Sequence, residues 1–175
     1  YNADARSQYA TTIGYEAFTS GTRAIALGYQ SSSTSNNAIS LGYQSTADAT
    51  RAIAIGQGST ASASDAVAIG YGTIVTGTYG VGISADSVTM EGAIAIGRWS
   101  SAKGINSIAI GPYVDVETDY EVRIGNFNTE TIGGYVNWTA ASDKRFKTNI
   151  QEDVVGLDFI KKLRPITYVF DQEAL

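Results

Sequence analysis

Ser142 and Lys147 are the two residues of this 175-residue chain whose types and spacing could support nucleophilic catalysis. The chain has no histidine, so a serine hydroxyl would have to give its proton to a neutral lysine amine. Burial and the neighbouring cations Lys144 and Arg145 would favour that neutral form, whereas Asp143 would oppose it. On spacing alone the other interpretation is favoured, in which Ser142 caps a helix and the basic run is a solvated surface.

Other chemistry has little support in the composition. Without cysteine or histidine the chain has no disulfide framework and no thiolate or imidazole ligand for a metal. It also has no phosphate-binding loop, no Gly-Gly-x-Gly-x-Asp calcium repeat and no recurring pair of carboxylates. We therefore expect no cofactor and no metal, and at most a single-turnover Ser-Lys autoprotease.

A column of tyrosines is the second candidate site. Tyr15, Tyr29, Tyr43 and Tyr71 each follow a repeated glycine, and Gln57 interrupts the series. Successive coils would stack these rings on one outer edge, where Tyr29, Tyr43 and Tyr71 could bind a sugar or a protein surface. The alternative, which we expect, is stacking within the protein that stabilises a turn.

The element that positions these tyrosines is a 14-residue repeat. Its marker residue recurs at a constant spacing, except that the step between Ser84 and Gly97 is one residue shorter than the others. The marker positions are Gly14, Gly28, Gly42, Gly56, Gly70, Ser84, Gly97, Gly111 and Gly125. A short and strict period predicts a solenoid, whose units gain stability by stacking on their neighbours.

Each repeat predicts two short strands. Large aliphatic residues such as Ile53 and Ile55 alternate with small ones such as Ala52 and Ala54 before the glycine, which is the period of a strand. A second alternation of small residues follows the glycine, and the glycine itself marks the bend. We expect the aliphatic face to pack inside the coil and the small face to let another backbone come close. Because such a coil has little interior, we expect several chains to share a core.

The segments Asp65–Gly70 and Asn106–Gly111 carry a resemblance. Their sequences, Asp-Ala-Val-Ala-Ile-Gly and Asn-Ser-Ile-Ala-Ile-Gly, resemble the repeat of trimeric autotransporter adhesin heads over residues 11–125. The resemblance implies an all-β, left-handed parallel β-roll that forms a parallel homotrimer and binds host surfaces or matrix proteins. We expect the solenoids to meet through their small Ala/Gly/Ser faces. Phage tail fibres and other exported bacterial fibres contain similar repeats.

The domain organisation follows from where the repeat stops. We expect residues 1–125 to form the β-roll head or shaft, 126–141 a neck or linker, and 142–175 a short α+β segment. In the last coil Glu121 and Arg123 replace the small residues, either as an ion-pair ring between chains or as an ordinary solvated pair. Beyond them the sequence predicts an amphipathic helix over 153–163, which Pro165 ends, and a strand over 166–170.

The residues after 141 carry a second resemblance. Ser142-Asp143, Arg145, Lys147, Asn149-Ile150, Leu157, Leu163-Arg164-Pro165 and Tyr168 resemble the start of the intramolecular chaperone domain of phage endosialidases and tail fibres. That domain helps three chains assemble and then cuts itself off with a Ser-Lys dyad, which implies Ser142 and Lys147 as catalytic residues and a cut at Ala141–Ser142. The resemblance ends near residue 170, and we expect the rest of the domain to lie beyond Leu175. A degenerate module that no longer cleaves is the alternative.

Charge and hydropathy narrow the partners. A net charge of −5 and a pI near 4.6 disfavour nucleic acid, and no apolar run approaches the ~18 residues of a membrane span. Because the chain begins at Tyr1, we expect it to be a piece of a longer exported protein. The sequence predicts an extracellular, structural and adhesive trimeric fibre segment, on a bacterial surface or a virion tail, whose partners are itself and a host surface protein or glycan. The alternative is the stalk and chaperone of an enzyme whose catalytic domain lies upstream.

Overall fold

The computed structural model describes residues 2–135, 156 and 160–163. Contacts divide the chain into two units, residues 1–132 and 133–175. In the described part of the second unit, a turn brings the amide nitrogen of Ile160 within 3.3 Å of the carbonyl oxygen of Gly156. Most of the helix expected over 153–163 and all of the strand expected over 166–170 lie outside the described residues. No helix within the described ranges has the length and apolar character needed to cross a membrane.

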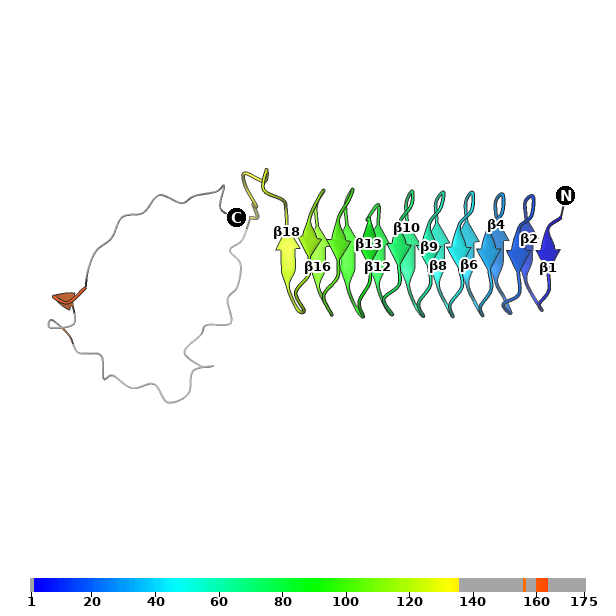
Figure 1. Cartoon of the computed structure of the whole chain (residues 1–175), viewed down its shortest axis with the longest axis horizontal. Helices are drawn as coiled ribbons and strands as arrows, with labels where there is room; N and C mark the ends of the chain where they lie inside the picture. Colours follow the sequence, from blue (N-terminus) through cyan, green and yellow to red (C-terminus); the bar gives the residue numbers. More distant parts are fainter. Residues whose placement is uncertain (1, 136–155, 157–159, 164–175) are drawn as a thin grey trace. The chain divides into compact units, whose positions relative to one another are not determined.

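The first unit is a parallel β-solenoid made of two nine-stranded sheets (Figure 1). The narrow sheet, named for its two-residue strands, consists of β1 (Asp4–Ala5), β3 (Phe18–Thr19), β5 (Ser32–Ser33), β7 (Thr46–Ala47), β9 (Thr60–Ala61), β11 (Ile74–Val75), β13 (Ser87–Val88), β15 (Ser101–Ala102) and β17 (Asp115–Val116). The wide sheet, with three-residue strands, consists of β2 (Thr11–Ile13), β4 (Ile25–Leu27), β6 (Ile39–Leu41), β8 (Ile53–Ile55), β10 (Val67–Ile69), β12 (Val81–Ile83), β14 (Ile94–Ile96), β16 (Ile108–Ile110) and β18 (Val122–Ile124). The chain alternates between the sheets, so one coil contains one strand of each.

The strand register follows the period of the sequence. Ile39 pairs with Ile53, and Ile53 pairs with Val67. The shorter step after Ser84 does not disturb this register, since Val81 still pairs with Ile94. The strands and the solenoid expected over residues 11–125 are therefore confirmed.

The bend that follows a wide strand favours glycine, and Ser84, with a φ of 51°, takes its place after β12. Gly28 and Gly42 both have a φ of 139°, in the region that only glycine adopts at low cost. Each glycine also lies directly against the next coil. A Cβ on Gly28 would collide with the carbonyl oxygen of Gly42, so this position has neither the backbone angle nor the room for a side chain.

The prediction of which face lies inside the coil is wrong. Ala52 and Ala54 are 0% exposed and lie in the core of the coil, opposite Ala47 and Ala61 of the narrow sheet. The large residues between them, such as Ile53, point outward and remain partly exposed. The small faces are therefore not free to meet another chain.

The physical reason is the width of the coil interior. The two sheets lie so close together that the size of an interior residue on one sheet is matched to the size of the residue opposite it on the other sheet. Gly82 replaces an alanine of the wide sheet, and the narrow sheet fills the space with Val75 and Val88, both 0% exposed. A Cβ on Gly82 would lie 2.9 Å from a methyl carbon of Val75, so an aliphatic row would not fit inside.

The last coil ends the solenoid with a charged residue at an interior position. Arg123 pairs in register with Ala109 of the coil before it. Its guanidinium lies 2.6 Å from a carboxylate oxygen of Glu121 and donates a hydrogen bond of 2.7 Å to the carbonyl oxygen of Asp115. The pair is thus formed within the chain, and it places a charge where a further coil would need an alanine.

Candidate functional site

The turns that join each wide strand to the next narrow strand form one edge of the solenoid, which we call the tyrosine edge. They comprise residues 14–17, 28–31, 42–45, 56–59, 70–73, 84–86, 97–100 and 111–114. All but one have four residues, and the turn at 84–86 has three. The candidate binding tyrosines lie at the second position of these turns, so the edge positions them all in one line.

A buried serine closes many of these turns. The hydroxyl groups of Ser45, Ser59 and Ser100 donate hydrogen bonds of 3.2, 3.0 and 2.7 Å to the carbonyl oxygen of the glycine three residues earlier. Because a buried hydroxyl without a partner is costly, this bond satisfies the serine and fixes the turn. This serine was not among the predicted functional residues, although the recurring Gly-x-x-Ser spacing in the sequence is a usable signal for it.

The tyrosine rings form a ladder over three coils. The centroids of Tyr15 and Tyr29 lie 5.2 Å apart, and those of Tyr29 and Tyr43 lie 5.1 Å apart, with interplanar angles of 15° and 6°. The neighbouring position carries a parallel chain of hydrogen bonds, in which Gln44 donates to Gln30 at 2.9 Å and Gln30 donates to Glu16 at 2.7 Å. The expected stacking of successive rings is confirmed for these three tyrosines.

Tyr71 is different from the other candidates. The coil of Gln57 separates it from Tyr43, and its side chain is 79% exposed, compared with 42% for Tyr29. The structure therefore brings Tyr29 and Tyr43 together as part of a stabilising stack. Tyr71 instead stands beside the shortened turn at 84–86, where it lines a pocket.

Replacing Tyr29 and Tyr43 together with serine is expected to lower the free energy of unfolding, because both ring stacks are lost. Stacked aromatic pairs contribute about 0.5–1.5 kcal/mol each beyond the area that they bury, so we expect a loss of about 1–3 kcal/mol per chain. Tyr71→Ser is the matched control, and its effect should be within about 0.5 kcal/mol. Denaturant unfolding followed by circular dichroism measures both. An unchanged midpoint for the double variant would favour a purely binding role for these two tyrosines.

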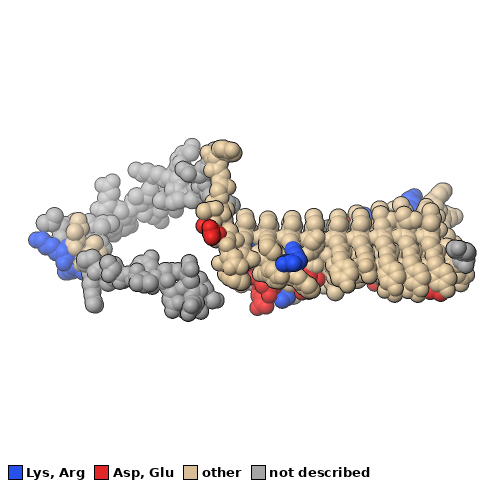
Figure 2. Space-filling model, turned by 90° about the horizontal axis from the view of Figure 1, so that it is seen from above, with Lys and Arg blue, Asp and Glu red and all other residues tan. Residues whose placement is uncertain are grey.

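The proposed catalytic residues fall elsewhere. The described residues do not include the proposed dyad, Ser142 and Lys147, or Ala141, whose peptide bond to Ser142 would be cut. Their roles therefore stay predictions from the sequence. On the face shown in Figure 2, few charged side chains lie over the middle of the solenoid, and acidic ones lie toward the β18 end. A partner that contacts the middle of this face would therefore meet mostly neutral side chains.

Comparison with known proteins connects the two parts of the chain to two families. The model of the YadA head domain repeat, which spans two copies, matches residues 5–31, 33–59, 47–73, 61–81 and 89–113, together more than half of the chain. These matches leave out residues 82–88, which include the shortened turn. A second family model, described as the chaperone of endosialidase, matches residues 142–175. No curated protein matches the chain.

Among solved structures, the chain is similar to the collagen-binding domain of the Yersinia adhesin YadA. The crystal structure of that domain aligns with a TM-score of 0.52 and 22% sequence identity, over 81% of this chain and 80% of that one. At this identity the likeness concerns the fold. The family matches confirm both the adhesin-head and the chaperone resemblance.

Proposed function

Since this chain belongs to the family of proteins built from the YadA head domain repeat, we propose that it is a structural and adhesive segment of a homotrimeric fibre. In this proposal residues 1–125 form a left-handed β-roll head or shaft, 126–141 a neck, and 142–175 the start of an assembly module with α+β structure. The fibre is extracellular and belongs to a bacterial surface or a virion tail.

The observation that carries the proposal is the outward face of the wide sheet. Two columns of large aliphatic side chains run along this face, which we call the aliphatic face, and every one of them is partly or largely exposed in the single chain. The columns are Ile25, Ile39, Ile53, Val67, Val81, Ile94, Ile108 and Val122, and Leu27, Leu41, Ile55, Ile69, Ile83, Ile96, Ile110 and Ile124. A continuous apolar surface of this length marks an interface.

Copies of the same chain fit this surface. Closed symmetry is the rule for homo-oligomers, and parallel chains would place equivalent coils at equal height, so that each aliphatic column meets one of the same length. In a three-membered ring each chain has two neighbours, which matches its two columns. The resemblance to trimeric adhesin heads supports the same number.

The adhesive role has support of a different kind. The neighbour in fold is named as a collagen-binding domain, so a fibrous matrix protein is the first ligand to test, and a host glycan is the second. Both would bind the surfaces that remain open once the aliphatic faces are covered, namely the narrow sheet and the two edges.

Residues 142–175 supply the assembly module in this proposal, supported by the match to the chaperone of endosialidase. Its task would be to bring three chains into register before their solenoids pack against one another. Ser142 and Lys147 are our proposed dyad for its removal by self-cleavage at Ala141–Ser142.

Sedimentation equilibrium of the purified chain tests the trimer. We expect a single species with three times the 18.4 kDa mass of one chain, and this species should not dissociate on dilution to nanomolar concentration. The same sample, passed over immobilised fibrillar collagen, tests the adhesive role, with heat-denatured collagen as the control surface. A stable folded monomer would contradict the proposal, whatever the binding result.

A further inference from the structure

One turn of the tyrosine edge departs from the others. The turn of residues 84–86, between β12 and β13, has three residues where the neighbouring turns 70–73 and 97–100 have four. The strands on both sides keep their pairing, since Gly82 faces Ala95 and Val88 faces Ala102. Only the turn at the edge is therefore shorter by one residue, and a recess lies at this turn.

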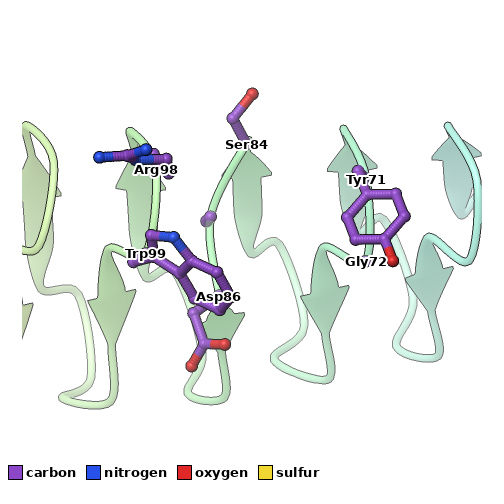
Figure 3. Close-up of a pocket in the computed structure, with 7 residues that line it drawn as sticks. Tyr71, Gly72, Ser84, Asp86, Arg98 and Trp99 are labelled. Carbon is purple, nitrogen blue, oxygen red and sulfur yellow. The ribbon is translucent and has the colours of Figure 1, made fainter.

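The recess is a pocket of about 380 Å³. Tyr71 and Gly72 line it from one neighbouring coil, Arg98 and Trp99 from the other, and residues 84–86 from the short turn between them (Figure 3). In the close-up, the Trp99 indole extends from its own coil toward Asp86 of the short turn, and Tyr71 lies on the other side of that turn. Along the solenoid axis, the pocket thus interrupts the tyrosine edge for the height of one coil.

The spacing of the coils sets the width of this interruption. Stacked tyrosines on adjacent coils are 5.1–5.2 Å apart, so each coil accommodates one ring thickness. The coils of Tyr71 and Trp99 are separated by one ringless coil and lie about 10 Å apart along the axis. The recess between these two coils therefore has room for one six-membered ring beside the Trp99 indole.

Trp99 occupies the third position of its turn. Its φ is 61°, which is a feature of this turn position, since Glu16, Gln30 and Tyr113 also have a positive φ there. Among the turns of this edge only Trp99 and Tyr113 carry an aromatic ring at that position, so the turn itself does not require one. With an exposed fraction of 60%, the Trp99 ring beside the short turn is available for contact with a ligand.

Asp86 is exposed at the short turn. The Arg98 guanidinium lies 5.1 Å from the centroid of the Tyr113 ring and points away from Asp86 (Figure 3). An anionic ligand would be repelled by the Asp86 carboxylate. Hydroxyl groups suit this lining, because they can donate hydrogen bonds to that carboxylate.

We propose that this pocket binds one neutral pyranose unit of a host glycan. The C–H face of the sugar ring would lie against the negative face of the Trp99 indole, with Tyr71 on the far side and hydroxyl groups directed to Asp86. The inference deepens the adhesive role and rests on it. A trimer would present three such pockets at the same height along the fibre. A multivalent glycan could then bind the trimer more tightly than it binds any single pocket.

Tryptophan fluorescence can test the pocket directly. Of the two tryptophans in the chain, Trp138→Phe removes the other one and leaves Trp99 as the reporter. Titration with the methyl pyranosides of glucose, galactose and mannose should shift the Trp99 emission saturably for at least one of them. Asp86→Asn should weaken that binding by about tenfold, the typical effect of losing one hydrogen bond to a charged group.

Three further variants complete the test. Trp99→Ala should abolish binding of the same pyranoside, measured by saturation-transfer difference NMR, and so should insertion of a tyrosine between Ser84 and Ala85, which restores a four-residue turn and fills the slot. Tyr79→Ala is the matched control, since Tyr79 is 59% exposed but lies on the opposite edge, and it should leave binding unchanged.

The proposal is overturned if no pyranoside shifts the emission, if binding survives Trp99→Ala, or if tetramethylammonium or acetate binds in place of the sugars. Sedimentation of the same samples separates this inference from the proposed trimer. A trimer that binds no pyranoside contradicts the pocket alone, whereas a monomer that binds one contradicts the trimer alone.

Discussion

Ile55→Asp is expected to abolish the trimer. Ile55 lies in the middle of the aliphatic face and is partly exposed in the single chain, so the aspartate itself can be solvated while the chain is alone. In the assembly the same carboxylate would be buried three times without a partner, at a cost of several kcal/mol for each copy. Sedimentation should then report single chains or a chain that fails to fold, in place of the trimer.

Thr60→Asp is the control for this variant. Thr60 belongs to the narrow strand of the same coil and is also partly exposed, but it lies on the sheet opposite the aliphatic face. Its substitution should leave the sedimenting mass at three chains. If Ile55→Asp stays trimeric with an unchanged midpoint of unfolding, the aliphatic face is not the interface.

The interior alanines give a second contrast. Ala54 is adjacent to Ile55 in sequence but is 0% exposed inside the coil. A larger side chain at Ala54 would overpack the coil itself, which costs about 1–3 kcal/mol, whether or not the chains associate. Damage from Ala54 substitutions is therefore a property of each chain, whereas damage from Ile55 substitutions is a property of the interface.

These two residues show what the sequence can and cannot determine. Alternation of Ala52, Ile53, Ala54 and Ile55 is sufficient to predict a strand, because its period is local. The same alternation is compatible with either face being inside, and the usual preference for large aliphatic residues in the core favours the wrong one. Which face lies inside depends on the distance between the two sheets of a coil, and the sequence of a single strand does not specify that distance.

A subtler signal for the correct face was present in the sequence. Gly80 and Gly82 replace alanines in the coil where Val75 and Val88 replace small residues of the narrow sheet. The structure shows that a Cβ on either glycine would lie 2.9 Å from a methyl carbon of Val75. When one strand has smaller residues where the facing strand has larger ones, the two sets of residues share one interior. This pattern could have predicted that the small residues lie inside the coil.

The edge was easier to predict than the core. A tyrosine in the same position of successive repeats must lie one coil above its neighbour, so the stack of Tyr15, Tyr29 and Tyr43 follows from the period alone. The shorter step after Ser84 was also visible, but only the structure shows that the strands keep their register. The lost residue therefore had to come from the edge, beside Trp99.

Self-cleavage at Ala141–Ser142 is the second expected result with a large effect. When the chain is expressed with a complete chaperone domain after residue 142, we expect two fragments whose masses place the cut at or beside this bond. Intact-protein mass spectrometry reports both the extent and the position of the cut. For residues 1–175 alone we expect essentially no cut, because the resemblance to the chaperone domain implies a larger fold that would bury Lys147 and keep its amine neutral near pH 7.

The chemistry requires both members of the dyad. Lys147 would accept the proton of the Ser142 hydroxyl as its oxygen attacks the carbonyl carbon of Ala141. The C–N bond of the peptide breaks, an ester to Ser142 forms, and the amine of Ser142 leaves with a proton. Water then hydrolyses the ester, which gives a carboxylate at Ala141 and restores the serine.

The variants assign these roles separately. Ser142→Ala removes the nucleophile and Lys147→Ala removes the base, so each should reduce cleavage of the longer form to an undetectable level. Lys161→Ala is the matched control, since it removes a lysine of the same module outside the proposed dyad, and its product should be cut as fast as the parent. Continued processing of the Ser142→Ala protein at the same bond would show that an external protease makes the cut. The segment would then be an assembly module without chemistry of its own, and the trimer proposed from the aliphatic face would be unaffected.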